Sequence, residues 1–223
     1  NKTLTSPKIN EDVAVTSTAT ELNLLDGKAA TNLALIGKQA GTNFTNSLLV
    51  GHATTGTLNA ATSNTGIGIG ALDALTSGDN NTAVGYNAGT ATNEGYQNVY
   101  VGSNSGGNSG GQSQTLVGES AGASASGRYI TGIGRNALKL SSGRNNVGIG
   151  NGSGDNITSG AGNVIIGSVD ASSATGNRQL KIANTDGSTT TTWIDGDSDG
   201  NVSVSANLNL SGSNKELRFY EGA

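Results

Sequence analysis

The chain has 223 residues, 36 of them glycine, with only 13% charged residues and a net charge of −4. This charge argues against general nucleic-acid binding, because phosphate contacts need a surplus of Lys and Arg. With no cysteine, a disulfide framework, a thiolate zinc site and a cysteine nucleophile are excluded. The sequence has no apolar run of about eighteen residues, so it predicts no membrane-spanning segment. Methionine is absent even at position 1, and we expect an internal piece of a longer chain.

Residues 1–32 form an entry segment. Thr18–Glu21 has the spacing of a capping box, and three leucines follow before Asp26-Gly27. This pattern predicts a short helix that ends at the glycine.

Residues 33–171 contain one motif in nine copies: a β-branched residue followed by glycine. The copies are Ile36-Gly37, Val50-Gly51, Ile67-Gly68, Val84-Gly85, Val101-Gly102, Val117-Gly118, Ile133-Gly134, Ile149-Gly150 and Ile166-Gly167. Successive glycines are 14 to 17 residues apart. A fixed period of this kind is the signature of a solenoid, in which each repeat forms one coil and stacks on the next. We therefore predict an all-β solenoid of about nine coils, each with two short strands and two turns.

Positions in each coil are numbered from the motif glycine. Position −1 is always Ile or Val and position −3 is mostly Thr or Val, so these two columns on one strand face are predicted to be the interior. Position +3 is small in nearly every copy, which suits a narrow coil. Position −4 holds asparagine in most coils and Gln114 in one. We interpret these amides as turn formers that tolerate a left-handed backbone, with an amide ladder between coils as the alternative.

Position −2 lies on the opposite strand face. It holds no charged residue in any copy, and its members are Leu35, Leu49, Gly66, Ala83, Tyr100, Leu116, Gly132, Gly148 and Ile165. A strand that is apolar or small on both faces is buried on both faces. The sequence therefore predicts a homo-oligomer that covers this outer face.

Residues 172–223 change pattern and form a predicted shaft or connector to a downstream domain. Four stretches alternate as strands do: Gln179–Ala183, Thr190–Ile194, Val202–Ser205 and Glu216–Tyr220. Asp-Gly and Ser-Gly pairs separate them, which is typical of hairpin turns.

Two repeats carry a family resemblance. Asn81–Gly89 (NTAVGYNAG) and Asn163–Gly167 (NVIIG) resemble the head repeats of YadA-type trimeric autotransporter adhesins, which also occur in bacteriophage tail fibres. The resemblance implies a homotrimeric, left-handed parallel β-roll. The ends of the chain, at 2–10, 20–27 and 214–222, are similar to segments of tail fibre proteins of marine phages.

We therefore expect a structural segment of a phage tail fibre: a rigid trimeric shaft or head that supports host attachment. The resemblance implies an extracellular place on the virion tail. Its expected partners are further copies of itself, other virion or fibre proteins and a host surface glycan, with no cofactor and no catalytic residue. A bacterial surface adhesin head is the alternative, and a polysaccharide depolymerase is a third, minor one.

Asp195, Asp197 and Asp199, followed by Gly200, match the start of a calcium-binding loop. Ala206 stands where such a loop needs a bidentate glutamate, so Asp-Gly hairpin turns explain the same residues. His52, the only histidine, is expected to be a surface residue.

Charged residues on neighbouring coils suggest two surface features. Glu119 and Arg135 directly follow consecutive motif glycines and predict an ion pair between coils. Arg128 and Arg144 occupy equivalent positions and, with Lys139, predict a basic patch; it is either a solvated face or a contact for anionic glycans.

Two further activities have little support in the repeats. The six acids of the array form no pair that recurs in register, which argues against an enzyme that cleaves polysaccharides. Ice binding would need an outward threonine on every coil. Threonine occupies position −3 in only four of the nine copies and is expected to face inward.

Overall fold

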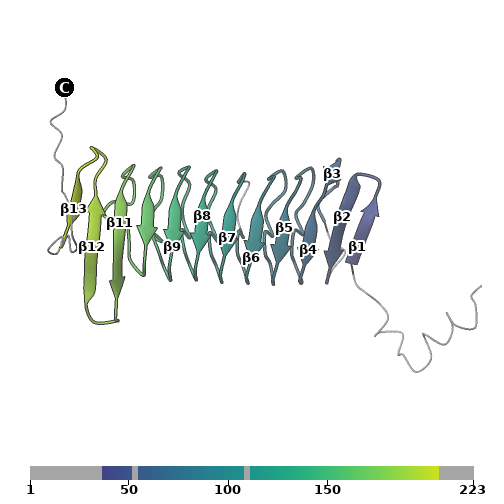
Figure 1. Cartoon of the computed structure of the whole chain (residues 1–223). Helices are drawn as coiled ribbons and strands as arrows, with labels where there is room; N and C mark the ends of the chain where they lie inside the picture. Colours follow the sequence, from purple (N-terminus) through teal and green to yellow (C-terminus); the bar gives the residue numbers. More distant parts are fainter. Residues whose placement is uncertain (1–36, 52–54, 108–110, 206–223) are drawn as a thin grey trace, which may run out of the picture. The chain divides into compact units, whose positions relative to one another are not determined.

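A computed structural model describes residues 37–51, 55–107 and 111–205 (Figure 1). All of them belong to one compact unit, Ile36–Ala223. Three sequence predictions lie outside the described residues: the helix within 18–27, the surface position of His52 and the strand at 216–220.

The described residues form one 13-stranded sheet whose central part is a parallel stack of about eight turns. Within this stack, each strand pairs in parallel with the strand of the next coil (Figure 1). The stacked strands are β2 (Phe44–Val50), β4 (Thr65–Ile67), β5 (Thr82–Val84), β6 (Val99–Val101), β7 (Thr115–Val117), β8 (Thr131–Ile133), β9 (Val147–Ile149) and β10 (Val164–Ile166). The predicted all-β solenoid is thus confirmed.

Antiparallel strands flank the stack at both ends. At one end β1 (Gly37–Gly41) pairs antiparallel with β2, so the first motif glycine, Gly37, lies in a hairpin and not in a coil. The two-residue β3 (Ala61–Thr62) also pairs with β2. At the other end β11 (Leu180–Thr185) joins β10 in parallel, and β12 (Thr190–Gly196) and β13 (Val202–Val204) follow antiparallel. These three strands match the predicted stretches of the third segment.

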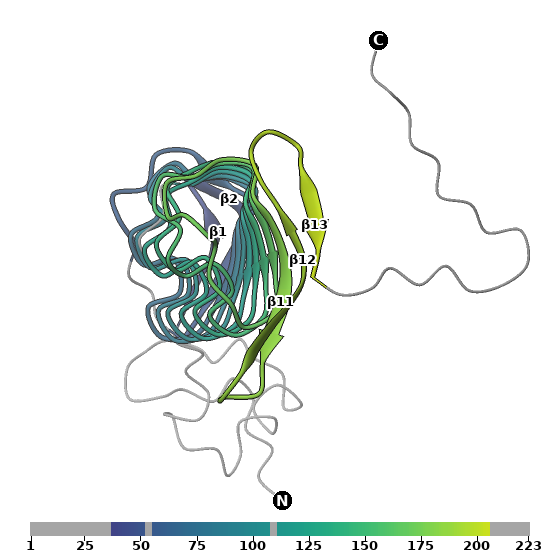
Figure 2. The same ribbon diagram turned by 90° about the vertical axis from the view of Figure 1, so that its left-hand side faces the viewer.

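From β5 to β10 each coil contains one three-residue strand, not the two strands that we predicted; β2 has seven residues, and the two-residue β3 precedes β4. The rest of the coil is turn, and these turns are also hydrogen-bonded from coil to coil. Leu72 N–H donates to Ala88 O and Ala74 N–H donates to Thr90 O, at 3.1 and 3.2 Å. Backbone donors and acceptors are therefore satisfied along the stack without a second strand. Figure 2, which looks along the stack, shows successive coils superimposed.

Coils of 16 and 17 residues stack without any change in strand register. In 17-residue coils the extra residue stands at position +8, just before the turn that leads to the next strand. Thr76, Asn93 and Thr158 occupy it. In 16-residue coils such as 118–134, position +7 is followed directly by the Ser-Gly of that turn. We call position +8 the corner. It absorbs the difference in length, so the strands keep their pairing.

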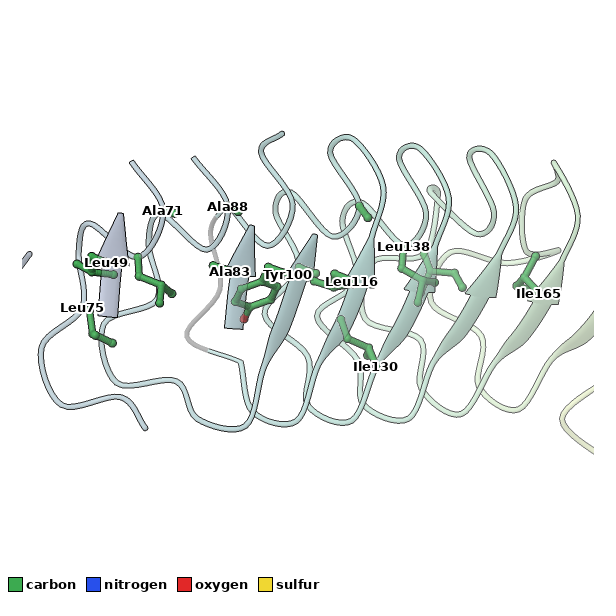
Figure 3. Close-up of a cluster of buried hydrophobic side chains, with 14 of the residues drawn as sticks. Leu49, Ala71, Leu75, Ala83, Ala88, Tyr100, Leu116, Ile130, Leu138 and Ile165 are labelled. Carbon is green, nitrogen blue, oxygen red and sulfur yellow. The ribbon is translucent and has the colours of Figure 1, made fainter. Parts of the chain in front are cut away.

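The strand face that points into the coil is the opposite of the one that we predicted. Within the described residues, the position −2 side chains that we expected at an oligomer interface, Tyr100 among them, lie inside the coil and are fully buried (Figure 3). At position −1, which we expected inside, Ile67 is 45% exposed and Ile133 is 40% exposed. In a three-residue strand the central residue points to one side and its two neighbours to the other. The central residue here is position −2.

Glycine at position −2 makes room for neighbouring leucines. A Cβ on Gly66 would lie 2.5 Å from Leu49 Cδ2, and a Cβ on Gly132 would lie 2.9 Å from Leu116 Cδ2. The column thus mixes large and small residues, and the glycines leave the space that the neighbouring leucines fill. Further interior columns at positions +4 and +7, which the sequence analysis missed, contribute Leu72, Leu75, Leu138 and Ile157. The small residues at +3 are buried from Ala71 to Ser153, as predicted.

Tyr100 is the largest fully buried side chain among the described residues. Its hydroxyl donates to Gln114 Oε1 at 2.8 Å, which satisfies the phenol inside the coil. Gly89 and Gly106 border the ring, and a Cβ on Gly89 would lie 2.7 Å from Tyr100 Cδ2. Two glycines therefore create the space for the one aromatic ring in the interior column.

The position −4 amides form a buried ladder, which makes our turn-former interpretation wrong. Asn81 is representative: its Nδ2 donates to Gly95 O at 2.7 Å and to Asn64 Oδ1 at 3.0 Å. Its Oδ1 accepts the N–H and the Nδ2 of Asn98. The left-handed residues are those at position −5, such as Asn80 and Gln97. The position −4 amide itself binds the neighbouring coils, and Ile130 is the one interruption between Gln114 and Asn146.

The motif glycines are required by both backbone angle and space. From Gly51 to Gly167 their φ values lie between +109° and +137°, a region that residues with a side chain rarely adopt. Each glycine also touches the next one: a Cβ on Gly102 would lie 2.6 Å from Gly118 C. This close approach explains why the residue that follows the Ile or Val of the motif is always glycine.

Candidate functional site

The outer face of the stacked strands carries a continuous column of aliphatic side chains. We call positions −1 and −3 of these strands the aliphatic face. Its most exposed apolar members are Leu48, Ile67, Val99, Val101, Ile133 and Ile149. Large contiguous apolar patches on a soluble protein usually mark contact surfaces. The residues that the motif singled out therefore form a surface, not a core.

Threonine at position −3 also belongs to this outer face. Thr65, Thr82, Thr115 and Thr131 are half-buried or exposed there. Our argument that these threonines face inward is wrong. Valine or leucine takes the same position in other coils, so the face does not present the threonine on every coil that ice binding would need.

The predicted ion pair between coils is confirmed. Arg135 Nε lies 3.1 Å from Glu119 Oε2, and both side chains are more than half exposed. Such an exposed pair stabilises a fold by about 0.2–1 kcal/mol.

The three residues of the predicted basic patch do not lie at one site. Arg128 and Arg144 line one groove of about 570 Å³, together with Ser126, Gly127, Ser142, Gly143, Ser159 and Ala161. Lys139 does not line this groove. Burial raises the pKa of Asp155, and the charge of Lys139 acts there instead, where it opposes part of this rise. The groove lies in the turns that precede β8, β9 and β10, and none of its lining residues belongs to a strand.

Asp155 and Asp170 form a pair that the sequence analysis missed. Burial raises the pKa of Asp155, and the hydrogen bond and charge of Asp170 raise it further. Both line a cavity of about 460 Å³ with Lys181. They occupy different positions of their coils, +5 and +3, so a search for acids in register could not find them. Carboxyls in direct hydrogen bond are closer than the roughly 5 Å or more that separates the pair in glycosidases.

The calcium candidates form a turn between β12 and β13. Asp197 Oδ1 accepts the N–H groups of Asp199 and Asn201 at 2.9 and 3.0 Å, and its Oδ2 accepts Asn201 Nδ2 at 2.8 Å. The Asn201 bonds, first among these donors, lower the pKa of Asp197. Asp195 lies on β12. Within 37–51, 55–107 and 111–205, no three acidic or histidine side chains gather as a metal site.

Several aromatic side chains are exposed: Tyr86, Tyr96, Tyr129 and Trp193. Tyr96 donates its hydroxyl to Gln112 Oε1 of the next coil at 2.8 Å. Trp193 lies on β12, outside the stack of coils.

Comparison of the chain with protein-family models, with curated proteins and with solved structures found no match. In the part of the chain that the structure describes, no helix has the length and apolar character to cross a bilayer.

Proposed function

We propose that the chain is a structural segment of a homotrimeric fibre of the phage tail fibre type, which holds a host-binding part at a distance. The observation that carries the proposal is the aliphatic face. It leaves Ile and Val exposed or half-buried from β4 to β10, although the coil has a complete interior of its own. A second copy of the chain can cover this face with the same residues, as symmetric assemblies do.

The stack also has the mechanical character that a shaft needs. Successive coils are joined by strand pairing, by backbone hydrogen bonds between turns and by the buried amide ladder. Bending the stack would break bonds on several sides of the coil together. The trimeric state, the left-handed coil and the place on a virion tail come from the family resemblance of Asn81–Gly89 and Asn163–Gly167.

Measurement of the molar mass in solution tests the assembly. We expect three times the chain mass by light scattering for the unmodified chain. The double substitution Ile133→Lys and Ile149→Lys should give a folded monomer, because two buried charges per chain without partners are costly at an interface. Ile69→Lys is the matched control: Ile69 is 65% exposed but lies outside the strands. It should leave the trimer intact. A monomeric unmodified chain would refute the proposal.

A bacterial adhesin head is the second candidate, since the same resemblance covers it. Antibodies against the purified chain distinguish the two by immunogold electron microscopy. Labelling of virion tails supports the fibre, whereas labelling of bacterial surfaces without virions supports the adhesin. The depolymerase alternative requires shortened products after incubation with capsular polysaccharide.

A further inference from the structure

We propose that the groove between Arg128 and Arg144 binds oxyanions, specifically the carboxylate or sulfate groups of an acidic glycan. The groove is lined by a repeated Ser-Gly-Arg sequence, Ser126–Arg128 and Ser142–Arg144, followed by Ser159-Gly160-Ala161 on the next coil. The inference does not depend on the fibre proposal, because the groove is formed within one chain and lies outside the aliphatic face.

The two arginines stand one coil apart, which places their backbones about 4.8 Å from each other. Both are exposed, and among the described residues neither guanidinium has an acidic partner. Arg135, by contrast, is paired with Glu119. Two adjacent guanidinium groups without a counter-charge repel each other, and a shared oxyanion would relieve this repulsion with charge-assisted hydrogen bonds.

Other coils show how an oxygen is bound at the equivalent position. The backbone N–H of Thr62, at position −6, donates to Asp79 Oδ1 of the next coil at 2.7 Å. The N–H of Ala161, also at position −6, donates to Asn177 Oδ1 at 2.8 Å. At two coils, therefore, the chain itself supplies an oxygen to this N–H, and at one of them the oxygen is anionic.

Arg144 is at position −6 too, but the next coil offers it Ala161, whose side chain has no acceptor atom. In the described part of the chain, no acceptor contacts the Arg144 N–H. The small Ala161 side chain leaves space beside it, and the hydroxyl-bearing Ser159 lines the same groove. An oxyanion there would accept the Arg144 N–H, as Asp79 does for Thr62, while the two guanidinium groups neutralise its charge.

The chemistry favours an acidic glycan over a nucleic acid. The net charge of −4 repels a long polyanion outside the groove. Only two arginines line the groove, whereas phosphate-backbone binding uses a wider basic surface. A carboxylate or sulfate on a glycan needs only this local site, and serine hydroxyls can bind neighbouring sugar hydroxyls.

Calorimetry and amide NMR on the whole chain test the proposal, with sodium sulfate, a sulfated tetrasaccharide and neutral dextran as probes. We expect both anions, but not dextran, to shift the Arg144 amide signal. Arg128→Gln with Arg144→Gln should weaken tetrasaccharide binding about tenfold or more, because charge-assisted bonds are lost. Arg135→Gln, the matched control, should change it by less than about twofold, since that cation is already paired.

Ala161→Asp provides a test with both arginines present. Its carboxylate should take the place of the ligand oxygen, shift the Arg144 amide without any probe and block sulfate binding. The proposal is refuted if sulfate leaves the Arg144 amide unchanged, or if Arg135→Gln weakens binding as much as the double substitution. Equal binding of single-stranded DNA would also refute it, because it would indicate attraction of any polyanion.

Discussion

The parallel stack and the antiparallel strands β11–β13 belong to the same sheet, yet they are buried very differently. Each strand from β4 to β10 has a fully enclosed central residue, whereas β13 is exposed at every position and Trp193 on β12 is 48% exposed. The coil folds back behind its own strand and so makes an interior, which β11 still covers with the buried Ala183, whereas β12 and β13 have no fully buried side chain. Backbone pairing alone therefore does not create a core; the returning turns of the solenoid do.

Substitution of glycines with positive φ should give the largest difference in stability loss between the stack and the antiparallel end. Gly102→Ala in the stack combines an unfavourable φ of +132° with a clash against Gly118. We expect a loss of about 3 kcal/mol or more in the free energy of unfolding, from backbone strain and displaced packing. Gly187→Ala, in the β11–β12 turn, has a φ of +97° but open space around it. It should cost roughly 1 kcal/mol. Urea denaturation measures both, and equal losses would contradict the role of glycine stacking.

Removal of a ladder amide should be the next largest effect. Asn81→Ala leaves Gly95 O and the Asn98 backbone N–H without a buried partner, and we expect a loss of about 2–4 kcal/mol. Asn201→Ala removes an exposed amide from the turn after β12, where water replaces the lost bonds. Its cost should stay below about 1 kcal/mol. A similar cost at both sites would show that the ladder adds no stability beyond an ordinary surface bond.

A buried hydroxyl in the stack offers a stabilising change. Thr92 Oγ1 is buried and, among the described residues, has no hydrogen-bond partner. Thr92→Val keeps the shape of the side chain and removes the unsatisfied group, so we expect about 1 kcal/mol of added stability. Thr189→Val, at an exposed position of the β11–β12 turn, is the control and should change stability by less than about 0.5 kcal/mol. A destabilised Thr92→Val variant would be inconsistent with this assignment.

The stack should also differ from its antiparallel end in its response to pH. The raised pKa of Asp155 means that the folded chain holds a proton that the unfolded chain loses. Its contribution to stability therefore falls as pH rises from the ordinary value of 3.8 through the raised pKa. Hydrogen bonds lower the pKa of Asp186 in the β11–β12 turn, with that from Thr189 first. The Asp186 contribution is present above 3.8 and is lost as pH falls through the lowered pKa.

Thermal unfolding of two variants as a function of pH tests these opposite signs. Asp155→Asn should raise the melting temperature at pH 7 relative to the unmodified chain, and the difference should shrink towards acid pH. Asp186→Asn should lower it slightly at pH 7, with a difference that also shrinks in acid. The assignment of Asp155 fails if its substitution is destabilising at pH 7.

The smallest effect should come from the ion pair between coils. A double-mutant cycle with Glu119→Gln and Arg135→Gln should give a coupling of about 0.5 kcal/mol that decreases with added salt. A coupling above about 2 kcal/mol would mean that the pair is far less solvated than its exposure indicates.

The sequence was sufficient to predict the solenoid and the strands β11 to β13, but neither the single strand in each coil nor the β1–β2 hairpin. The glycine period sets the coil, and glycine at that position is the residue that both φ and space demand. The ion pair of Glu119 and Arg135 was equally accessible, because identical offsets in consecutive coils place residues side by side.

Which face of the strand points into the coil could not be predicted from the repeat pattern. Both faces of the strand are apolar, and we predicted that the more uniform column, Ile or Val at position −1, forms the core. Uniform β-branched residues instead suit the flat outer face of a sheet, whereas the interior mixes Gly66, Ala83 and Tyr100 because each fits against different neighbours. The ladder and the Asp155–Asp170 pair depend on where turns place side chains, which column alignment does not reveal.

The corner at position +8 has a consequence for how such a chain can diversify. It gains or loses a residue between coils while strands on both sides stay aligned, and Asn93 and Thr158 stand there with exposed side chains. Gene duplication that copies one coil imperfectly would therefore still yield a foldable product. The same spot is a natural attachment point for grafted epitopes or ligand-binding peptides on the coils that carry the extra residue.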